Sequence, residues 1–293
     1  PGANDAIFSN GEKMEIAKRE THMTTPKSIR WRLIAIVLCH CLPAVSLAIG
    51  TVPLPEHPRP DFQRAQWLNL NGSWQFQFDP NDRGRTEKWF ESKKPFPDEI
   101  RVPFSWGSPL SGMDDQADIG WYARSIQVPK DWQGKEVFLV IGACDWHTTA
   151  WLDGHKLGEH RGGYTPFAFD LTEHLRVGQP QRLVLRVDDT PHAFKLEGKQ
   201  GYGRAAGIWQ TVYLEARPTL ALETVHFTPD IDAQEVRVDV TLDQPATDEI
   251  RFQLRFRESD RAESVVTEPF PRGTRRHAFV LPLKQPRLWS LDD

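Results

Sequence analysis

The chain has 293 residues, enough for two domains of ordinary size, and its hydrophobic content of 39% suits a folded protein with a core. Its 36 basic and 40 acidic residues leave a net charge of −4, which excludes the strongly basic surface of a nucleic-acid-binding protein. The 11 Trp and 16 Phe favour β-sheet cores, with aromatic platforms for sugar stacking as the alternative.

The amino-terminal region has the form of a secretory signal peptide. A basic flank precedes an apolar run over residues 33–42, and Ser46 and Ala48 supply the small residues of a cleavage site. The run is too short to span a membrane comfortably. We expect residues 23–48 to be removed and the folded part to be secreted or periplasmic, with an uncleaved anchor as the alternative. Residues 1–22 are expected to be an extension of the gene model.

Residues 49–61 contain four prolines and predict an extended arm. After the arm, short runs alternate apolar and polar side chains with a period of two and are separated by Gly, Pro and Asp. This pattern is typical of antiparallel strands. A helical turn is indicated only near Asp170, its candidate cap. The predicted strands before residue 217 cover residues 68–78 around a turn, 121–128, 137–144, 147–152 and 183–187.

The pattern changes at residues 216–218. Short strands then follow at regular spacing without helix signals, which resembles an immunoglobulin-like sandwich of about seven strands. Fewer strands than that are present, so the sandwich is expected to be cut short. The predicted strands cover residues 220–229, 235–242, 250–257 and 277–283.

Cys144 is the one cysteine outside the signal peptide, which excludes an internal disulfide in the mature chain. It lies in an apolar strand, so we expect a buried, unreactive thiol. Asn71 and Ser73 form an N-glycosylation sequon, but they lie at a turn between two strands, and we interpret them as part of that turn.

Several short stretches occur in a fixed order along the chain. They read Leu70-Asn71-Gly72-Ser73-Trp74-Gln75-Phe76, Val102-Pro103-Phe104-Ser105-Trp106, Gly120-Trp121-Tyr122, Ala150-Trp151-Leu152-Asp153-Gly154, His160-Arg161-Gly162-Gly163-Tyr164-Thr165-Pro166-Phe167 and Gly207-Ile208-Trp209-Gln210-Thr211-Val212. Together they resemble the non-catalytic amino-terminal part of glycoside hydrolase family 2, the β-galactosidase and β-glucuronidase family. Two departures are mild: Ala150 stands where the family usually has valine, and Asp153 where it has asparagine.

The resemblance implies an all-β chain. Residues 62–217 would form a jelly-roll (galactose-binding-like) β-sandwich, the sugar-binding domain, and residues 218–293 an immunoglobulin-like β-sandwich. The stretch 286–290 is similar to the family's segment just before its last sandwich strand and its (β/α)8 barrel. That barrel carries the family's two catalytic glutamates. Because the matching segment lies so close to residue 293, the resemblance implies that the barrel is absent from this chain.

The family hydrolyses β-glycosides with retention, using an acid and a carboxylate nucleophile about 5 Å apart. No residue matches either glutamate, so none is expected to be catalytic, and the acidic stretch 114–118 is interpreted as an exposed loop. The resemblance therefore implies the amino-terminal part of a retaining exo-β-glycosidase, β-galactosidase-like, that acts in carbohydrate metabolism and is inactive alone. The alternative is a stand-alone carbohydrate-binding or cell-surface adhesion module.

Asp189, Lys199 and Gln200 are the candidate substrate-binding residues. The resemblance implies that an aspartate shortly before the closing Gly-Ile strand contacts the terminal sugar, and Asp189 has a comparable position. Carboxylates accept charge-assisted hydrogen bonds from hydroxyls. Asp188 and Asp189 equally suit a strand end followed by a turn, and they support a cation site only weakly.

No metal or other cofactor is expected. The implied partners are a carbohydrate substrate and the protein's own catalytic barrel, with no nucleic acid and no membrane after cleavage of the signal peptide. The sequence leaves open which sugar is bound and whether the protein is a homo-oligomer.

Overall fold

The computed structural model describes residues 52–191, 206–256 and 264–283. The predicted signal peptide and the candidate residues Lys199 and Gln200 lie outside these ranges. The described part of the chain is almost entirely β-structure, and every strand pairing in it is antiparallel, as the sequence predicts. Among the described helices, none is long and apolar enough to cross a membrane.

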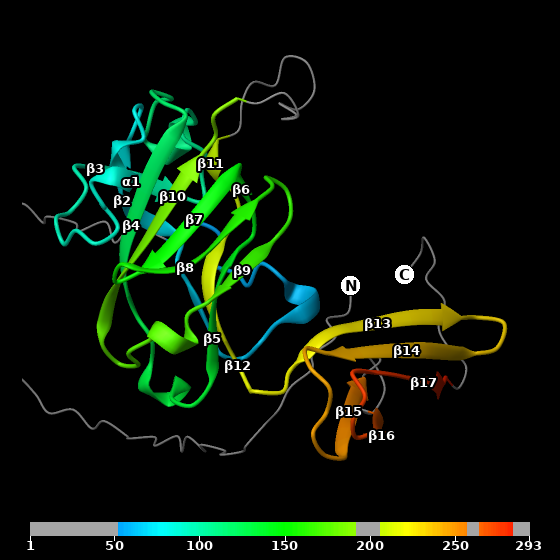
Figure 1. The fold of residues 1–293 in the computed structure, drawn as a ribbon. Coiled ribbons are helices and arrows are strands. Elements are labelled where there is room, and N and C mark those ends of the chain that lie inside the picture. Colours follow the sequence, from blue (N-terminus) through cyan, green and yellow to red (C-terminus); the bar gives the residue numbers. More distant parts are fainter. Residues whose placement is uncertain (1–51, 192–205, 257–263, 284–293) are drawn as a thin grey trace, which may run out of the picture. The chain divides into compact units, whose positions relative to one another are not determined.

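The first sandwich is built from two main sheets (Figure 1). One sheet has the order β1-β12-β5-β9, and the other has the order β3-β2-β4-β10-β7-β8. A short third sheet pairs β6 with β11. The strands are β1 (Trp67–Asn69), β2 (Gly72–Phe78), β3 (Asp98–Val102), β4 (Ile119–Gln127), β5 (Glu136–Ile141), β6 (Cys144–Asp145), β7 (His147–Leu152), β8 (His155–Arg161), β9 (Phe167–Asp170), β10 (Pro180–Asp188), β11 (Gly207–Ile208) and β12 (Val212–Arg217).

The core of this sandwich follows from the period-two pattern of its strands. On β2, Trp74 and Phe76 are buried, whereas Ser73 and Gln75 are exposed. Strands of both main sheets contribute to one hydrophobic cluster, including Leu139 of β5. Cys144 is buried as predicted, and burial raises the pKa of its thiol.

The turn between β1 and β2 buries the sequon asparagine. Asn71 is 1% exposed, and its side-chain amide donates to Pro53 O at 3.0 Å and to Thr211 Oγ1 at 3.2 Å. Its side-chain oxygen accepts from Val212 N at 3.0 Å. Asn71 therefore joins the proline-rich arm to β12, which agrees with its interpretation as a structural turn residue.

A second aromatic layer covers the opposite face of the six-stranded sheet. Trp121 and Trp151 of that sheet stack at 5.5 Å, and Trp89, Phe90 and Phe96 pack over them. The covering segment includes the short helix α1 (Arg83–Thr86), which the strand pattern did not predict.

Asp79 anchors this covering segment to the sheet. Its carboxylate accepts from the backbone N of Arg83 and of Gly84, both at 2.8 Å, and from Trp121 Nε1 at 3.0 Å. Gly84 is required there because a Cβ would lie 2.7 Å from the rings of Trp121 and Trp89.

The helical turn predicted near Asp170 is the 3₁₀ helix η4 (Thr172–His174). Leu171 occupies the cap position instead of Asp170, but Asp170 Oδ1 accepts from Thr172 N at 2.8 Å. Three further 3₁₀ helices were not predicted: η1 (Pro60–Phe62), η2 (Pro109–Ser111) and η3 (Lys130–Trp132).

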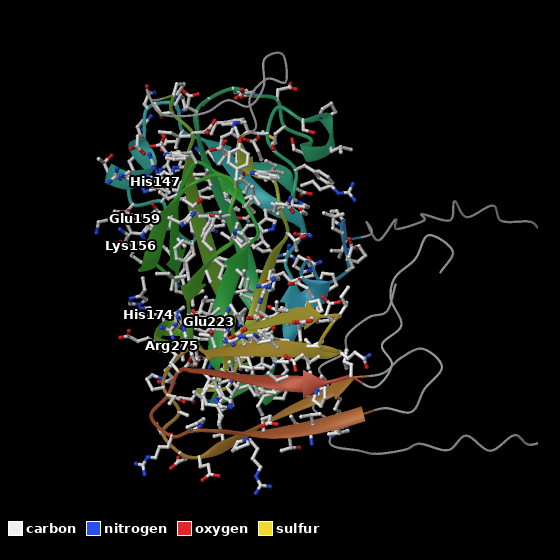
Figure 2. The ribbon with its side chains drawn as sticks, turned by 90° about the vertical axis from the view of Figure 1, so that its right-hand side faces the viewer. His147, Lys156, Glu159, His174, Glu223 and Arg275 are labelled. Atoms are coloured by element: carbon white, nitrogen blue, oxygen red, sulfur yellow. The ribbon has the colours of Figure 1, made fainter. Side chains whose placement is uncertain are left out.

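The carboxyl-terminal strands form two sheets around their own hydrophobic cluster. Glu223 and Arg275 make an exposed ion pair of 2.7 Å there (Figure 2). Four of the five strands were predicted, and β16 was missed because Glu268 and Pro269 interrupt its apolar pattern. One sheet contains β13 (Leu222–Asp230), β14 (Glu235–Leu242) and β17 (Arg276–Pro282), and the other contains β15 (Ile250–Phe256) and β16 (Ser264–Phe270).

Candidate functional site

The short sheet of β6 and β11 brings together several of the ordered sequence stretches. Gly207 pairs with Asp145, and Ile208 N donates to Tyr122 Oη at 3.3 Å. Gly207 has φ of +81°, and a Cβ there would lie 2.3 Å from Tyr122 Oη and 2.5 Å from the Trp106 ring. Only glycine suits both this conformation and this close approach. The close packing of Tyr122 and Trp106 against position 207 therefore explains why the Gly-Ile-Trp stretch begins with glycine.

The turn after β8 is held against the same sheet. Gly162 N donates to Trp146 O at 3.1 Å, and Trp209 Nε1 donates to Gly163 O at 2.8 Å. A Cβ on Gly163 would lie 2.8 Å from Asp145 Oδ1. The Gly-Gly pair thus lets the turn approach β6 closely.

This turn presents an exposed aromatic pair. Tyr164 is 61% exposed, and its ring meets the half-buried Trp209 edge to face at 5.7 Å. Such a pair can pack against a sugar ring or against another protein domain. Trp106 and Trp121 are buried, in line with the sheet cores that the aromatic content favours, whereas Trp209 is half-buried and belongs to this exposed pair. Tyr164 was not among the residues predicted to bind substrate, although its position directly after the Gly-Gly pair is visible in the sequence.

The two aspartates after β10 differ in their surroundings. Asp188 Oδ2 accepts from Arg186 Nη2 at 2.9 Å, and its Oδ1 accepts from Thr190 N at 3.0 Å. Burial opposes ionisation of Asp188, but the hydrogen bonds from Thr190 and Arg186 outweigh it and lower the pKa of this carboxyl. Asp188 therefore ends the strand and begins a turn, one of the two interpretations of this pair.

Asp189 is fully buried, at 0% exposure, and its backbone N donates to Asp118 O at 2.7 Å. Burial raises the pKa of the Tyr122 hydroxyl, and the charge of Asp189 adds to that effect. A contact between Asp189 and a sugar stays a prediction. So do the contacts of Lys199 and Gln200, which lie outside the described residues.

Two histidines lie on neighbouring strands, His147 on β7 and His160 on β8, and Figure 2 labels His147 together with Glu159 of β8. His147 Nε2 lies 3.5 Å from Glu159 Oε2, and His160 stacks on Phe167 at 4.0 Å. Burial lowers the pKa of both imidazoles, and Arg161 lowers that of His147 further. Within the described ranges, no three or more His, Cys, Asp or Glu side chains are grouped to hold a metal ion.

The acidic stretch 114–118 is confirmed as largely exposed: Asp114 and Asp115 are exposed, and Asp118 is half-buried.

Comparison with protein families matches residues 68–218 to the sugar binding domain of glycosyl hydrolases family 2. Among similar proteins, a β-glucuronidase of Paenibacillus borealis is 34% identical over 41% of this chain and 21% of its own length. A β-glucuronidase of Rattus norvegicus is 23% identical over 81% of this chain and 41% of its own. A β-galactosidase of Thermoanaerobacter pseudethanolicus is 30% identical over 40% of this chain and 16% of its own. The chain thus spans less than half the length of each of these relatives.

Solved structures show the same fold. A β-glucuronidase of Ruminococcus gnavus superimposes with a TM-score of 0.59 and 20% identity, over 78% of this chain and 40% of its own. A β-glucuronidase from an uncultured Clostridium gives a TM-score of 0.58 and 24% identity, over 76% of this chain and 41% of its own.

Proposed function

The chain belongs to glycoside hydrolase family 2, and on this premise we propose that it is the amino-terminal, non-catalytic part of a retaining exo-β-glycosidase. The observation that carries the proposal is the unequal coverage of the alignments. The rat β-glucuronidase matches 81% of this chain, whereas the chain matches 41% of that enzyme. The remainder of such an enzyme would supply the acid and the nucleophile, which retaining hydrolysis needs about 5 Å apart.

Two acidic side chains of the first sandwich support this division of labour. Asp79 accepts from Trp121 and from the backbone of α1, and Asp188 accepts from Arg186 and Thr190. A nucleophilic carboxylate has to reach the anomeric carbon of a sugar, and these two carboxylates are committed to the fold.

The end of the sandwich that carries Tyr164 and Trp209 is the surface we assign to the catalytic domain. Asp189 directly follows β10 and Gly207 opens β11, and Lys199 and Gln200 lie between them in the sequence. We assign these three polar residues to the rim of the sugar site. The predicted signal peptide at residues 23–48 would direct export, so we propose that the whole enzyme is periplasmic or secreted.

Reading the gene beyond the codon for Asp293 tests this proposal. An in-frame (β/α)8 barrel with two strand-end glutamates is the expected result. The extended protein should then hydrolyse p-nitrophenyl β-D-glucuronide or β-D-galactoside with retention of anomeric configuration. A stop codon directly after Asp293 would contradict the proposal and would favour a stand-alone carbohydrate-binding module.

A further inference from the structure

The proline-rich arm buries a histidine against the outer face of the four-stranded sheet. His57 is 7% exposed, and its ring meets the Trp67 ring of β1 edge to face at 4.6 Å and the Tyr213 ring of β12 at 5.5 Å. Tyr213 points away from the core of the sandwich, because its neighbours Val212 and Leu214 belong to that core. The imidazole therefore fills a notch between two aromatic side chains on the outside of the sheet.

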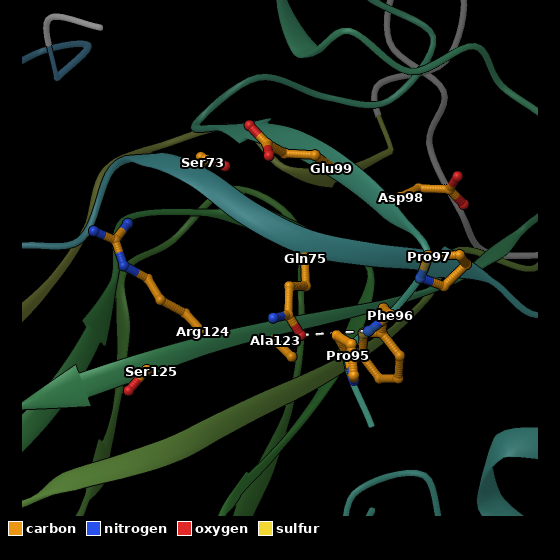
Figure 3. A pocket seen from close by; sticks show the side chains of 10 residues that line it. All are labelled: Ser73, Gln75, Pro95, Phe96, Pro97, Asp98, Glu99, Ala123, Arg124 and Ser125. Carbon is orange, nitrogen blue, oxygen red and sulfur yellow. Dashed lines mark hydrogen bonds between the residues drawn. The ribbon is translucent and has the colours of Figure 1, made fainter. Parts of the chain in front are cut away.

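The start of the arm is held by the turn between β1 and β2. Asn69 Nδ2 donates to Leu54 O at 2.8 Å, beside the bond from Asn71 to Pro53. The turn itself is fixed from the other main sheet, because Arg124 of β4, labelled in Figure 3, donates to Asn71 O at 3.0 Å. Amides and carbonyls do not titrate near neutral pH and a guanidinium stays charged there, so this anchor does not depend on pH in that range.

Directly after the arm, an ion pair ties the chain to β12. Arg64 Nε lies 3.0 Å from Glu215 Oε1, and Arg217 Nε lies 2.7 Å from the same oxygen. Both ends of the arm are thus fixed without a histidine, and His57 is the only histidine that the arm contains. Because the ordinary pKa of histidine lies between pH 5 and 8, His57 is the group of the arm that can respond to pH in this range.

A proton added to His57 would find little stabilisation in the notch. Nδ1 lies 3.1 Å from both N and O of Arg59, whereas the buried Nε2 has no hydrogen-bond partner among the described residues. Burial of the imidazole lowers the pKa of His57 from its ordinary 6.5. A hydrogen bond to the Arg59 backbone and the charges of Glu215 and Asp61 act against burial without outweighing it, and the charge of Arg59 acts with it. The Tyr213 hydroxyl is neutral here, because burial raises its pKa to about 12.

We propose that His57 is an acid-sensitive latch: the neutral imidazole keeps residues 52–61 on the four-stranded sheet, and its protonation releases them. An imidazolium in the notch is a buried cation with one unpaired N–H group, whereas water solvates it once the arm has left. As the pH falls, the released arm takes up the proton first, so the docked arm is favoured above pH 6.5 and loses this advantage below it.

Release of the arm would uncover the rings of Trp67 and Tyr213 on the outer face of the sheet. Neither a catalytic domain nor a bound sugar is needed for the latch, which therefore stands apart from the proposed function.

Hydrogen–deuterium exchange of the 293-residue chain at pH 7.5 and pH 5.0, read by mass spectrometry, tests the latch. Protection factors remove the intrinsic pH dependence of amide exchange. For an imidazole of pKa 6.5 that takes up its proton only in the released arm, the opening equilibrium rises at most about thirtyfold over this interval. We expect the peptide of residues 52–66 to lose protection by about fivefold or more at pH 5.0, and β2 to keep its protection. Unaltered protection of the arm, or an equal loss in β2, overturns the proposal.

Variants assign the effect to one histidine. His57→Phe keeps a ring in the notch without a titrating group, so its arm should be equally protected at both pH values. His155→Phe is the matched control, because His155 is exposed on β8 and stacks on His174 at 4.6 Å, and its arm should lose protection as in the unaltered chain. The same loss in His57→Phe as in the unaltered chain overturns the latch.

Titration of the unaltered chain by NMR gives a second measurement, which holds even if the His57→Phe arm does not dock. With histidine labelled by ¹³C and the His57 signal identified by its absence from the variant, we expect a midpoint below pH 6.5. A midpoint at or above pH 6.5 overturns the proposal, because a histidine that titrates normally in the docked arm cannot drive its release.

Discussion

The indole Nε1 of Trp209 donates a hydrogen bond of 2.8 Å to the carbonyl oxygen of Gly163, which lies 46 positions earlier in the chain. This bond ties the turn after β8 to the segment after β11. It also keeps the exposed ring of Tyr164 against the indole. The aromatic pair that we assign to the catalytic domain therefore has a fixed position on the first sandwich.

Trp209→Phe is expected to remove this bond while keeping an aromatic ring at the position. Because one hydrogen bond contributes about 1 kcal/mol net, the free energy of unfolding in urea should fall by about that amount. Tyr164→Phe is the control, since it keeps the ring contact, and it should change stability by less than about 0.5 kcal/mol. A smaller loss for Trp209→Phe than for Tyr164→Phe would show that the bond does not hold the turn.

Gly207→Ala should destabilise the first sandwich by about 3 kcal/mol or more. The new Cβ would combine backbone strain at a φ of +81° with overlap against Tyr122 Oη and Trp106. Gly273→Ala separates the two effects, because its φ is +77° and a Cβ there would have no atom within 4 Å. That variant should lose only about 1 kcal/mol. Equal losses in urea denaturation would rule out the overlap as the cause.

Arg186→Met should lower the free energy of unfolding by about 3 kcal/mol. The Arg186 side chain is 3% exposed and pairs with Asp82 at 2.8 Å and Asp188 at 2.9 Å, so its removal leaves Asp188 without this cation and Asp82 with only Arg85, at 3.7 Å. The matched control is Arg237→Met, whose exposed pair with Asp239 is screened by solvent and should contribute little to stability. Thermal unfolding followed by circular dichroism compares the two, and similar losses would contradict a structural role for the buried pair.

Stability should fall as the pH drops below 6.5, the ordinary pKa of histidine, in part because of His147 and His160. Burial lowers the pKa of both side chains in the folded state, so the unfolded chain takes up their protons first and acid favours unfolding. Their contribution is fully present above 6.5 and is lost below it. Replacing both histidines by Gln should therefore flatten this part of the profile of unfolding free energy against pH. His226→Gln, at an exposed position, should leave the slope unchanged, and a slope unaltered by the double variant would disprove the assignment.

The sequence predicted the strands whose alternation is clean. The prediction for residues 235–242 matches β14, and the predicted turn at residues 68–78 separates β1 from β2. It missed α1, because four residues held by the Asp79 carboxylate show no helical periodicity. It also missed β3, a short edge strand, because the exposed Asp98 and Glu99 at its start interrupt the apolar alternation.

The candidate site was less accessible to sequence reasoning. The glycines at positions 163 and 207 were visible as motif residues. They are required because Asp145, Tyr122 and Trp106, which are distant in sequence, leave no room for a Cβ atom at these positions. Asp189 was selected for its place before the closing strand, and its complete burial depends on tertiary packing that no local pattern encodes.

The most direct test of the central claim is the rate at which the purified 293-residue chain hydrolyses p-nitrophenyl β-D-glucuronide and β-D-galactoside. If the chain is the non-catalytic part of a β-glycosidase, the release of nitrophenol should equal that of a heat-denatured sample with both substrates. Turnover above that background, retained through purification to homogeneity, would contradict the account.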